Sequence, residues 1–325
     1  MQRHNAGPIL TRAHIPAMEP DISDVSSVFN PGAVRIGAHT YLLLRVQTRG
    51  RRTFSLPAVS PDGVSFRMAG APTLYQGLPL RDVHHIYDAR LTVLDGRLHA
   101  VTAVDCADGC RCALWRATGP QDGDFAGLEK LEFVSLVTDM DTRNAVLFPE
   151  RIGGLAHALH RPNQAALQDG PVSGTAVHLA VSEDLLTWHD RGPVFAGNPH
   201  YWDELVGSGP PPIKTRAGWL HIYHGIATHF QAANIYQAGV ILLDAHDPSL
   251  VLARGRQNIL EPREIWELTG QVPNVVFPSG ATVEGLDAEG FALPNAPVNI
   301  YFGAADTVVG LARSSVDRLI AACGR

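Results

Sequence analysis

The stretch RLTVLDGRLHAVTAV, residues 90–104, carries the pattern that decides the fold. Two short apolar runs flank an Asp-Gly pair, which is a typical signal for a tight hairpin turn. Similar runs, bounded by Gly, Pro, Asp or Asn, recur along the chain. They are TYLLLRV (40–46), TFSLPAVS (53–60), CALWRAT (112–118), VHLAVS (177–182), WLHIYHG (219–225), AGVILLD (238–244) and VNIYFGA (298–304). We therefore expect an all-β protein built from hairpins.

Helical patterns are scarce. SSVDRLIAAC (314–323) places apolar residues at helical spacing after a Ser-rich start, which predicts a short C-terminal helix. The first 25 residues and QAALQDGPVSG (164–174) are expected to be irregular. SEDLLTWHDRG (182–192) is typical of an outer hairpin with a structural role.

A weak repeat of fifty to sixty residues organises the strands. Each unit begins with a polar stretch that precedes paired strands. The five stretches are FNPGAV (29–34), IYDARLT (86–92), RNAVLFPER (143–151), GSGPPPIKT (207–215) and PNVVFPSG (273–280). Repeats of this length are typical of propellers. We therefore predict that residues 1–325 form one five-bladed β-propeller, with each stretch on an inner strand near the axis.

Composition restricts the function classes. The net charge of −6 argues against a general nucleic-acid or anionic-membrane binder, which would need a basic excess. The chain has no apolar run of about 18 residues, so no membrane span is expected. The N-terminal sequence lacks the apolar stretch of a signal peptide, and we expect a cytoplasmic protein.

Cysteines and histidines show no local metal-binding pattern. Cys106, Cys110 and Cys112 lack paired C-x-x-C spacing, and with Cys323 they are expected to be reduced structural thiols. The histidines do not fall at metal-ligand spacing, and no nucleotide-binding glycine loop or serine nucleophile motif is present. Neither a metal nor an organic cofactor is implied.

If the blades converge on one axis, the polar stretches build a basic, amide-rich pocket. Its expected members are Asp88, Arg90, Arg143, Asn144, Arg161, Lys214, His224, Asn274 and Asp306. Taken singly, each has a structural explanation, such as an Asp88–Arg90 salt bridge. Several cations around one axis would repel one another unless an anion joins them. Phosphate fits, because arginine forks and a lysine point charge both bind it. Lys214, one of only two lysines, follows three prolines that would hold it rigidly.

The same pieces, in this order, resemble glycoside hydrolase family 130, the β-mannoside phosphorylases and related mannosidases. The resemblance runs from FNPGAV to GAADT (303–307) and includes YDARLT, RNAVLFPE, LHRP, GSGPPPIKT and VFPSG. It implies a five-bladed propeller that performs inverting phosphorolysis of a β-mannosidic bond and releases α-mannose 1-phosphate. The substrates would be a short mannoside and inorganic phosphate, with no other cofactor. Family members are often oligomers, so a homo-oligomer is an open possibility.

The resemblance also implies residue roles. Asp88 matches the general acid, which is thought to pass its proton through the mannosyl 3-hydroxyl. The phosphate-binding positions correspond to Arg143, Asn144, Arg161, Lys214 and His224. The sugar-binding positions correspond to Asn30, Arg45, Tyr87, Arg90, Asn274 and Asp306. Further stacking surfaces could be provided by Tyr75, Trp202 and Tyr236.

Two other readings stay open. A β-mannoside hydrolase would be favoured if acids paired off the axial cations, since an inverting hydrolase needs a second carboxylate as base. Glu150 and Glu204 are nearby acids that we interpret as structural. A non-catalytic carbohydrate-binding propeller would be favoured if Asp88 were locked in a salt bridge with Arg90 and pointed away from the cavity.

The motifs resemble two branches of the family. Tyr87-Asp88-Ala89-Arg90 resembles the mannosyl-glucose branch, whereas VFPSG and GAADT resemble the mannooligosaccharide branch, and Leu205 stands where lysine is common. The acceptor sugar and the linkage are therefore open.

Overall fold

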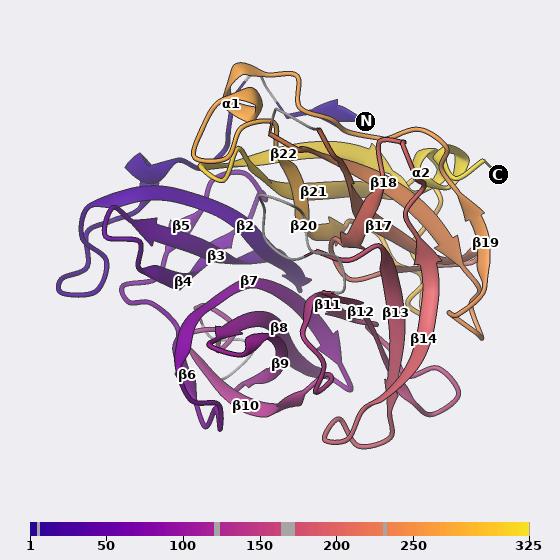
Figure 1. Ribbon diagram of the computed structural model, residues 1–325, viewed down its shortest axis with the longest axis horizontal. Helices are drawn as coiled ribbons and strands as arrows, with labels where there is room; N and C mark the ends of the chain where they lie inside the picture. The colour runs from indigo at the N-terminus through magenta and orange to yellow at the C-terminus, as the bar shows by residue number, and fades with distance from the viewer. Residues whose placement is uncertain (5–6, 120–123, 164–172, 230–232, 325) are drawn as a thin grey trace.

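The computed structural model describes residues 1–4, 7–119, 124–163, 173–229 and 233–324. Within these residues the strands form five sheets arranged around one axis, as the blades of a propeller (Figure 1). The predicted five-bladed architecture is confirmed.

The blades follow one another in chain order, except that the N-terminal β1 joins the last blade and that β6, at the outer edge of blade 2, precedes the other strands of that blade. Blade 1 contains β2 (Val25–Ile36), β3 (His39–Thr48), β4 (Thr53–Ser60) and β5 (Arg67–Met68). Blade 2 contains β7 (Val83–Leu94), β8 (Arg97–Cys106), β9 (Gly109–Ala117), β10 (Lys130–Leu136) and the outer β6 (Leu74–Gln76). Blade 3 contains β11 (Thr142–Leu147), β12 (Ala156–Pro162), β13 (Ala176–Ser182) and β14 (His189–Ala196). Blade 4 contains β15 (Leu205–Ser208), β16 (Ile213–Thr215), β17 (Gly218–Ala227), β18 (Ile235–Leu243) and β19 (Val251–Arg254). Blade 5 contains β20 (Val276–Val283), β21 (Pro297–Ala304), β22 (Val308–Ser315) and β1 (Gln2–Arg3).

The inner strands carry the five polar stretches, as predicted. Strand β2 contacts both β7 and β20, and β7 contacts β11, which in turn contacts β15. Each blade is packed between two others, so the second strand of a blade is buried on both faces. Nine of the ten residues of β17 are buried, which explains why WLHIYHG is a continuous run and does not alternate with polar residues.

The N-terminal strand closes the ring, a feature that the sequence analysis missed. β1 pairs with β22, so the first residues of the chain complete the last blade (Figure 1). Arg3 donates from Nε and Nη2 to the carboxylate of Glu267, at 2.7 Å each. Glu267 lies in α1 (Ile265–Leu268) and its side chain is fully buried. The closure is therefore locked by an ion pair with one buried partner.

Replacing Arg3 with Ala is expected to lower the free energy of unfolding by about 3 kcal/mol, because a buried carboxylate loses its counter-charge. Urea denaturation measures the change. Arg52→Ala is the matched control, since Arg52 is exposed and lies 3.8 Å from Asp21. Its expected effect is below about 0.5 kcal/mol. Equal effects of the two substitutions would contradict the role assigned to Arg3.

The remaining predictions about structure are mostly confirmed. The C-terminal helix is α2 (Val316–Ala322), and the described residues before β2 form no helix or strand other than β1 and the 3₁₀ turn η1 (Arg12–His14). Residues 182–192 span the end of β13, the connection 183–188 and the start of β14, and Trp188 Nε1 donates to Ser135 Oγ at 3.1 Å. Of the predicted loop 164–174, residues 164–172 lie outside the described residues. All four cysteines are free thiols. In the described part of the chain, no helix has the length and apolar character needed to cross a bilayer.

Candidate active site

Three inner strands are interrupted at the same place by a β-bulge. The register shifts after Phe29 in β2, after Tyr87 in β7 and after Arg143 in β11. The next residue in each strand has a positive φ, namely 44° for Asn30, 54° for Asp88 and 55° for Asn144. Asn and Asp tolerate this left-handed conformation better than other side chains. Because bulges redirect side chains, this repeated device places the three residues on corresponding positions around the axis.

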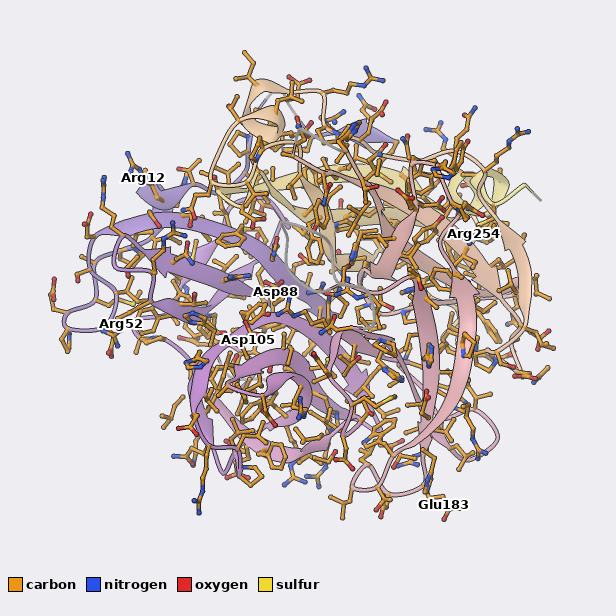
Figure 2. The ribbon with its side chains drawn as sticks, viewed as in Figure 1. Arg12, Arg52, Asp88, Asp105, Glu183 and Arg254 are labelled. Atoms are coloured by element: carbon orange, nitrogen blue, oxygen red, sulfur yellow. The ribbon has the colours of Figure 1, made fainter. Side chains whose placement is uncertain are left out.

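Asp88 is held at the centre of the ring (Figure 2). Its Oδ1 accepts hydrogen bonds from Asn30 Nδ2 and Arg45 Nη1, both at 3.1 Å. The Arg45 guanidinium lies between the rings of Phe29 and Tyr87, at 4.6 and 4.5 Å from their centroids. The Asp88 side chain keeps 12% of its surface exposed. Two strands of blade 1, β2 and β3, therefore hold the Asp88 carboxylate in place, and it stays accessible to a substrate, as a proton donor must be.

Arg90 does not bind the Asp88 carboxylate. It is almost fully buried, and its Nη1 donates to the Asp88 carbonyl at 2.9 Å while Nε donates to the Gly209 carbonyl at 2.8 Å. The sugar contact predicted for Arg90 stays a prediction, because Nε and Nη1 bond backbone carbonyls while the buried Nη2 has no hydrogen-bond partner within the described residues. Arg90 therefore stabilises the bulge at Asp88 and connects blade 2 to Gly209 of blade 4.

Asp105 is a site residue that the sequence analysis missed. It lies in β8 beside the bulged strand, near the centre of the ring (Figure 2). Its Oδ1 accepts from the Tyr87 hydroxyl at 3.0 Å and from Arg143 Nη2 at 3.1 Å. Asp105 thus connects the residue that precedes Asp88 with the first arginine of the predicted phosphate site. A charged residue at the end of the apolar run LHAVTAVD was the available signal.

Arg143 and Arg161 face each other across the β11–β12 pair. Arg161 is buried and donates from Nη2 to Asn163 Oδ1 at 3.0 Å. Within the described residues, no carboxylate pairs with Arg161, and the Nε atoms of both arginines lack a hydrogen-bond partner. Burial, reinforced by the nearby Arg143, lowers the pKa of Arg161 from 12.5 to about 10. Two neighbouring cations with unused donors favour binding of an anion.

His224 lies close to Asn144 and to Arg161. Its ring packs on Phe277 and Tyr236, with centroids at 4.6 and 6.1 Å. A Cβ atom built on Gly207 would lie 2.5 Å from His224 Cε1 and 2.8 Å from Asn144 Nδ2, so these side chains converge over a glycine that must lack a side chain. Burial, with Arg161 and Arg90 nearby, holds the pKa of His224 well below its usual value. The ring is therefore neutral at pH 7.

Lys214 lies apart from this group, which corrects the prediction that it binds phosphate. β16 pairs Lys214 with Trp219, whereas β15 pairs Gly207 with His224. His224 lies five positions after Trp219 in β17, which corresponds to about 16 Å along the strand. Lys214 Nζ donates to Glu150 Oε2 at 2.5 Å and lies 4.2 Å from the Phe291 ring centroid. It crosslinks blades 3, 4 and 5 at the other end of the axis, and Glu150 is its structural counter-ion.

The other predicted residues have separate surroundings. The Asn274 carbonyl accepts from the Tyr236 amide at 3.0 Å, and Asn274 has a φ of 62°. Tyr75 packs on Trp115 and hydrogen-bonds Ser55, while Trp202 stacks on Tyr223, so neither is placed as a sugar platform. Glu204 accepts from the Thr228 hydroxyl at 2.5 Å. The Leu205 side chain is buried and adds no charge to the site.

Asp306 is a second carboxyl group near Arg45 and Asp88. It follows β21 with a φ of 49°. Burial raises its pKa from 3.8 to about 6, an effect opposed by Arg45 and reinforced by the carboxylate of Asp88. Native Asp306 therefore holds its proton more tightly than the unfolded chain does. Its ionisation costs stability progressively as pH rises from about 4 to about 6, and the full cost is present above that range.

Asp306→Asn is accordingly expected to raise the free energy of unfolding at pH 7.5 by about 1–2 kcal/mol and to leave it nearly unchanged at pH 4. Urea denaturation at both values measures this. A gain of the same size at pH 4 would contradict the assignment, because a neutral carboxyl group and an amide cost similar free energy to bury.

Comparisons with known proteins agree with this architecture. Residues 1–325 match the model of glycoside hydrolase family 130, described as beta-1,4-mannooligosaccharide phosphorylase. The 1,2-beta-oligomannan phosphorylase of Thermoanaerobacter sp. is 32% identical over 259 residues, covering 78% of this chain and 76% of that protein. The 4-O-beta-D-mannosyl-D-glucose phosphorylase of Bacteroides fragilis is 28% identical, covering 97% of this chain and 83% of that protein.

A solved structure shows the same similarity in three dimensions. The β-1,2-mannobiose phosphorylase from Listeria innocua, in complex with β-1,2-mannobiose, superposes with a TM-score of 0.81 at 25% identity. The superposition covers 99% of each chain. Sequence, fold and coverage together establish that the chain belongs to glycoside hydrolase family 130.

Proposed function

We propose that this protein is a phosphorylase that cleaves the β-mannosidic bond of a short mannoside with inorganic phosphate. The reaction would invert the anomeric carbon and release α-mannose 1-phosphate. The observation that carries the proposal is Arg161, a buried cation beside Arg143 that has no carboxylate partner among the described residues. Such a group is costly to bury unless an anion completes it.

The chemistry follows from the arrangement around the axis. Asp88 protonates the bridging oxygen, through the mannosyl 3-hydroxyl as the family resemblance implies, while the bond from that oxygen to the anomeric carbon breaks. A phosphate oxygen attacks the same carbon from the opposite face and forms the new bond. Phosphate is already anionic at neutral pH, so no second carboxylate is needed as a base. Arg143, Asn144, Arg161 and His224 would orient it.

The substrate would be a mannobiose, a mannooligosaccharide or a mannosyl-glucose. The relatives named above act, by their names, on β-1,2-mannosides and on 4-O-β-mannosyl-glucose. We further propose that the enzyme is cytoplasmic, where a charged sugar phosphate is retained because it cannot cross the bilayer without a large cost.

A β-mannoside hydrolase is the second candidate. Two observations favour it: Asp105 already pairs with Arg143, and Asp306 supplies a second carboxyl group near Asp88. The binding-module alternative is not favoured, because Arg90 bonds the Asp88 carbonyl and the Asp88 carboxylate pairs with Arg45.

Product analysis on a panel of β-mannosides, with and without inorganic phosphate, tests the proposal. Phosphate-dependent α-mannose 1-phosphate is the expected product, and the second product identifies the acceptor sugar. Free mannose formed equally without phosphate would replace the phosphorylase by the hydrolase. Absence of cleavage on every mannoside, with sugar binding retained, would overturn both.

A further inference from the structure

Two histidines and one aspartate meet on the side of blade 3 that packs toward blade 2. His160 in β12 is opposite His178 in β13, so both side chains lie on one face of the sheet. Asp190 in β14 pairs with Ala180, two residues along from His178 and therefore on the same face. Arg161 follows His160 directly and points to the other face. The cluster is thus separate from the phosphate-binding arginines.

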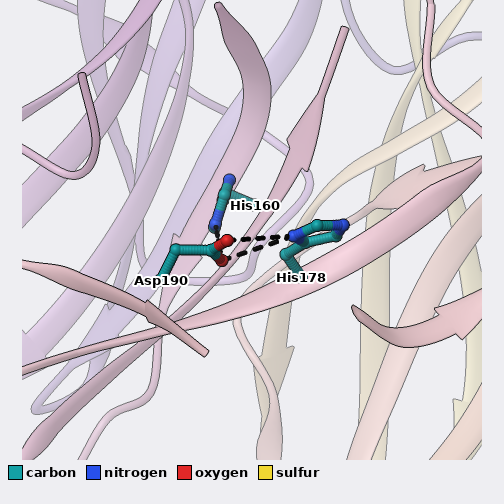
Figure 3. Close-up of side chains that lie close together, drawn as sticks. All are labelled: His160, His178 and Asp190. Carbon is teal, nitrogen blue, oxygen red and sulfur yellow. Dashed lines mark hydrogen bonds and ion pairs between the residues drawn. The ribbon is translucent and has the colours of Figure 1, made fainter. Parts of the chain in front are cut away.

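The side chains converge on one point (Figure 3). His160 Nε2 lies 3.1 Å from Asp190 Oδ1, and His178 Nδ1 lies 3.3 Å from each Asp190 oxygen. All three ligand atoms lie within 4.8 Å of one another. Ligands about 2.0–2.1 Å from a tetrahedral Zn²⁺ are separated by about 3.3 Å, which these distances approach. Small side-chain rotations would admit an ion between them.

The surroundings suit a metal site. The second ring nitrogen of His160 lies 3.1 Å from Thr142 Oγ1, a contact that fixes the ring orientation as outer partners of metal-bound histidines do. The Gly192 amide donates to Asp190 Oδ1 at 3.3 Å. Exposure of the side chains rises from 0% for His160 to 14% for His178 and 30% for Asp190. The site is therefore anchored in the interior and open to solvent on one side, which provides an entry path.

We propose that His160, His178 and Asp190 form a binding site for a zinc-type divalent cation that links the three outer strands of blade 3. Imidazole and carboxylate ligands suit Zn²⁺, and three protein ligands leave one position for water. The sequence alone indicated no metal because the ligands come from three strands and have no local spacing. The proposal is independent of the sugar chemistry at the axis.

Calorimetric titration of the chelator-treated full-length protein with Zn²⁺ tests the site. We expect one equivalent to bind, and Co²⁺ at the same site to show visible absorption of a low-symmetry complex. His178→Ala and Asp190→Asn should each weaken binding at least about 100-fold, since losing a ligand costs more than losing an outer partner. Both residues are partly exposed, so these variants should fold, and circular dichroism verifies it.

His246→Ala is the matched control. His246 is an exposed histidine close to a carboxylate, Asp244, in a different blade. The His246→Ala variant should bind Zn²⁺ as the wild type does. Zn²⁺ should raise the melting temperature of the wild type and of His246→Ala, but not that of His178→Ala or Asp190→Asn. Failure of the wild type to bind one equivalent would overturn the proposal. So would unchanged binding by His178→Ala and Asp190→Asn.

Discussion

Asp88→Asn is expected to lower the rate of mannoside cleavage by about 10³-fold or more, because the variant keeps the shape of the site and loses the transferable proton. Asparagine is the informative replacement. It tolerates the φ of 54° at this position, whereas alanine would strain the bulge. An amide can also keep its contact with Arg45 or Asn30 through its oxygen. Sugar binding should therefore survive, as calorimetry would show.

The control for this experiment is Asp108→Asn. Asp108 lies beyond β8 on the surface and pairs only with Arg111 among the described residues. The activity of the Asp108→Asn variant should equal that of the wild type. An Asp88→Asn enzyme that retained activity within about tenfold would remove Asp88 from the role of general acid.

Arg161→Ala is expected to raise the KM for phosphate by about 10- to 100-fold, the loss associated with a charge-assisted hydrogen bond of about 1.5–3 kcal/mol. The KM for the mannoside should change much less, because Arg161 belongs to blade 3, whereas Asp88 and Asn30 belong to blades 2 and 1. Initial rates over a matrix of phosphate and mannoside concentrations separate the two constants. Arg161→Lys should recover part of the loss, since it restores the charge without the planar fork.

Lys214→Ala is the matched control for a lost cation. Because Lys214 pairs with Glu150 at the other end of the blade, the phosphate KM should stay unchanged while stability falls by about 1 kcal/mol. A raised phosphate KM in Lys214→Ala would show that Lys214 contributes to phosphate binding. An unchanged phosphate KM in Arg161→Ala would show that the phosphate is bound elsewhere.

Much of the fold was predictable from the sequence because a propeller is built from local hairpins. Each blade follows its motif within one repeat, so the turn at Asp95-Gly96 and the apolar runs on either side identify a strand pair without reference to the rest of the chain. The ring closure was not predictable in this way. β1 contains two residues and pairs with Arg313 and Ala312 at the other end of the chain.

The site shows the same division. The order of the motifs predicted that Asp88, Arg143, Asn144, Arg161 and His224 would share one pocket. Lys214 was misplaced because GSG and IKT are close in sequence but pair with opposite ends of β17, a strand that rises by about 3.3 Å per residue. Asp105 was missed because its partners, Tyr87 and Arg143, come from two other strands.

The sequence by itself determined the all-β class, the five units and the family, since short-range periodicity and motif order are properties of the linear chain. The tertiary structure decided which charges meet. Arg161 is left without a carboxylate in the described chain, Lys214 is paired, and His160, His178 and Asp190 converge from three strands. Strand register and blade packing determine the distances between these charged groups to within an ångström or two. A change of that size alters the energy of an ion pair, whereas the hydrophobic pattern that selects the fold is unaffected by it.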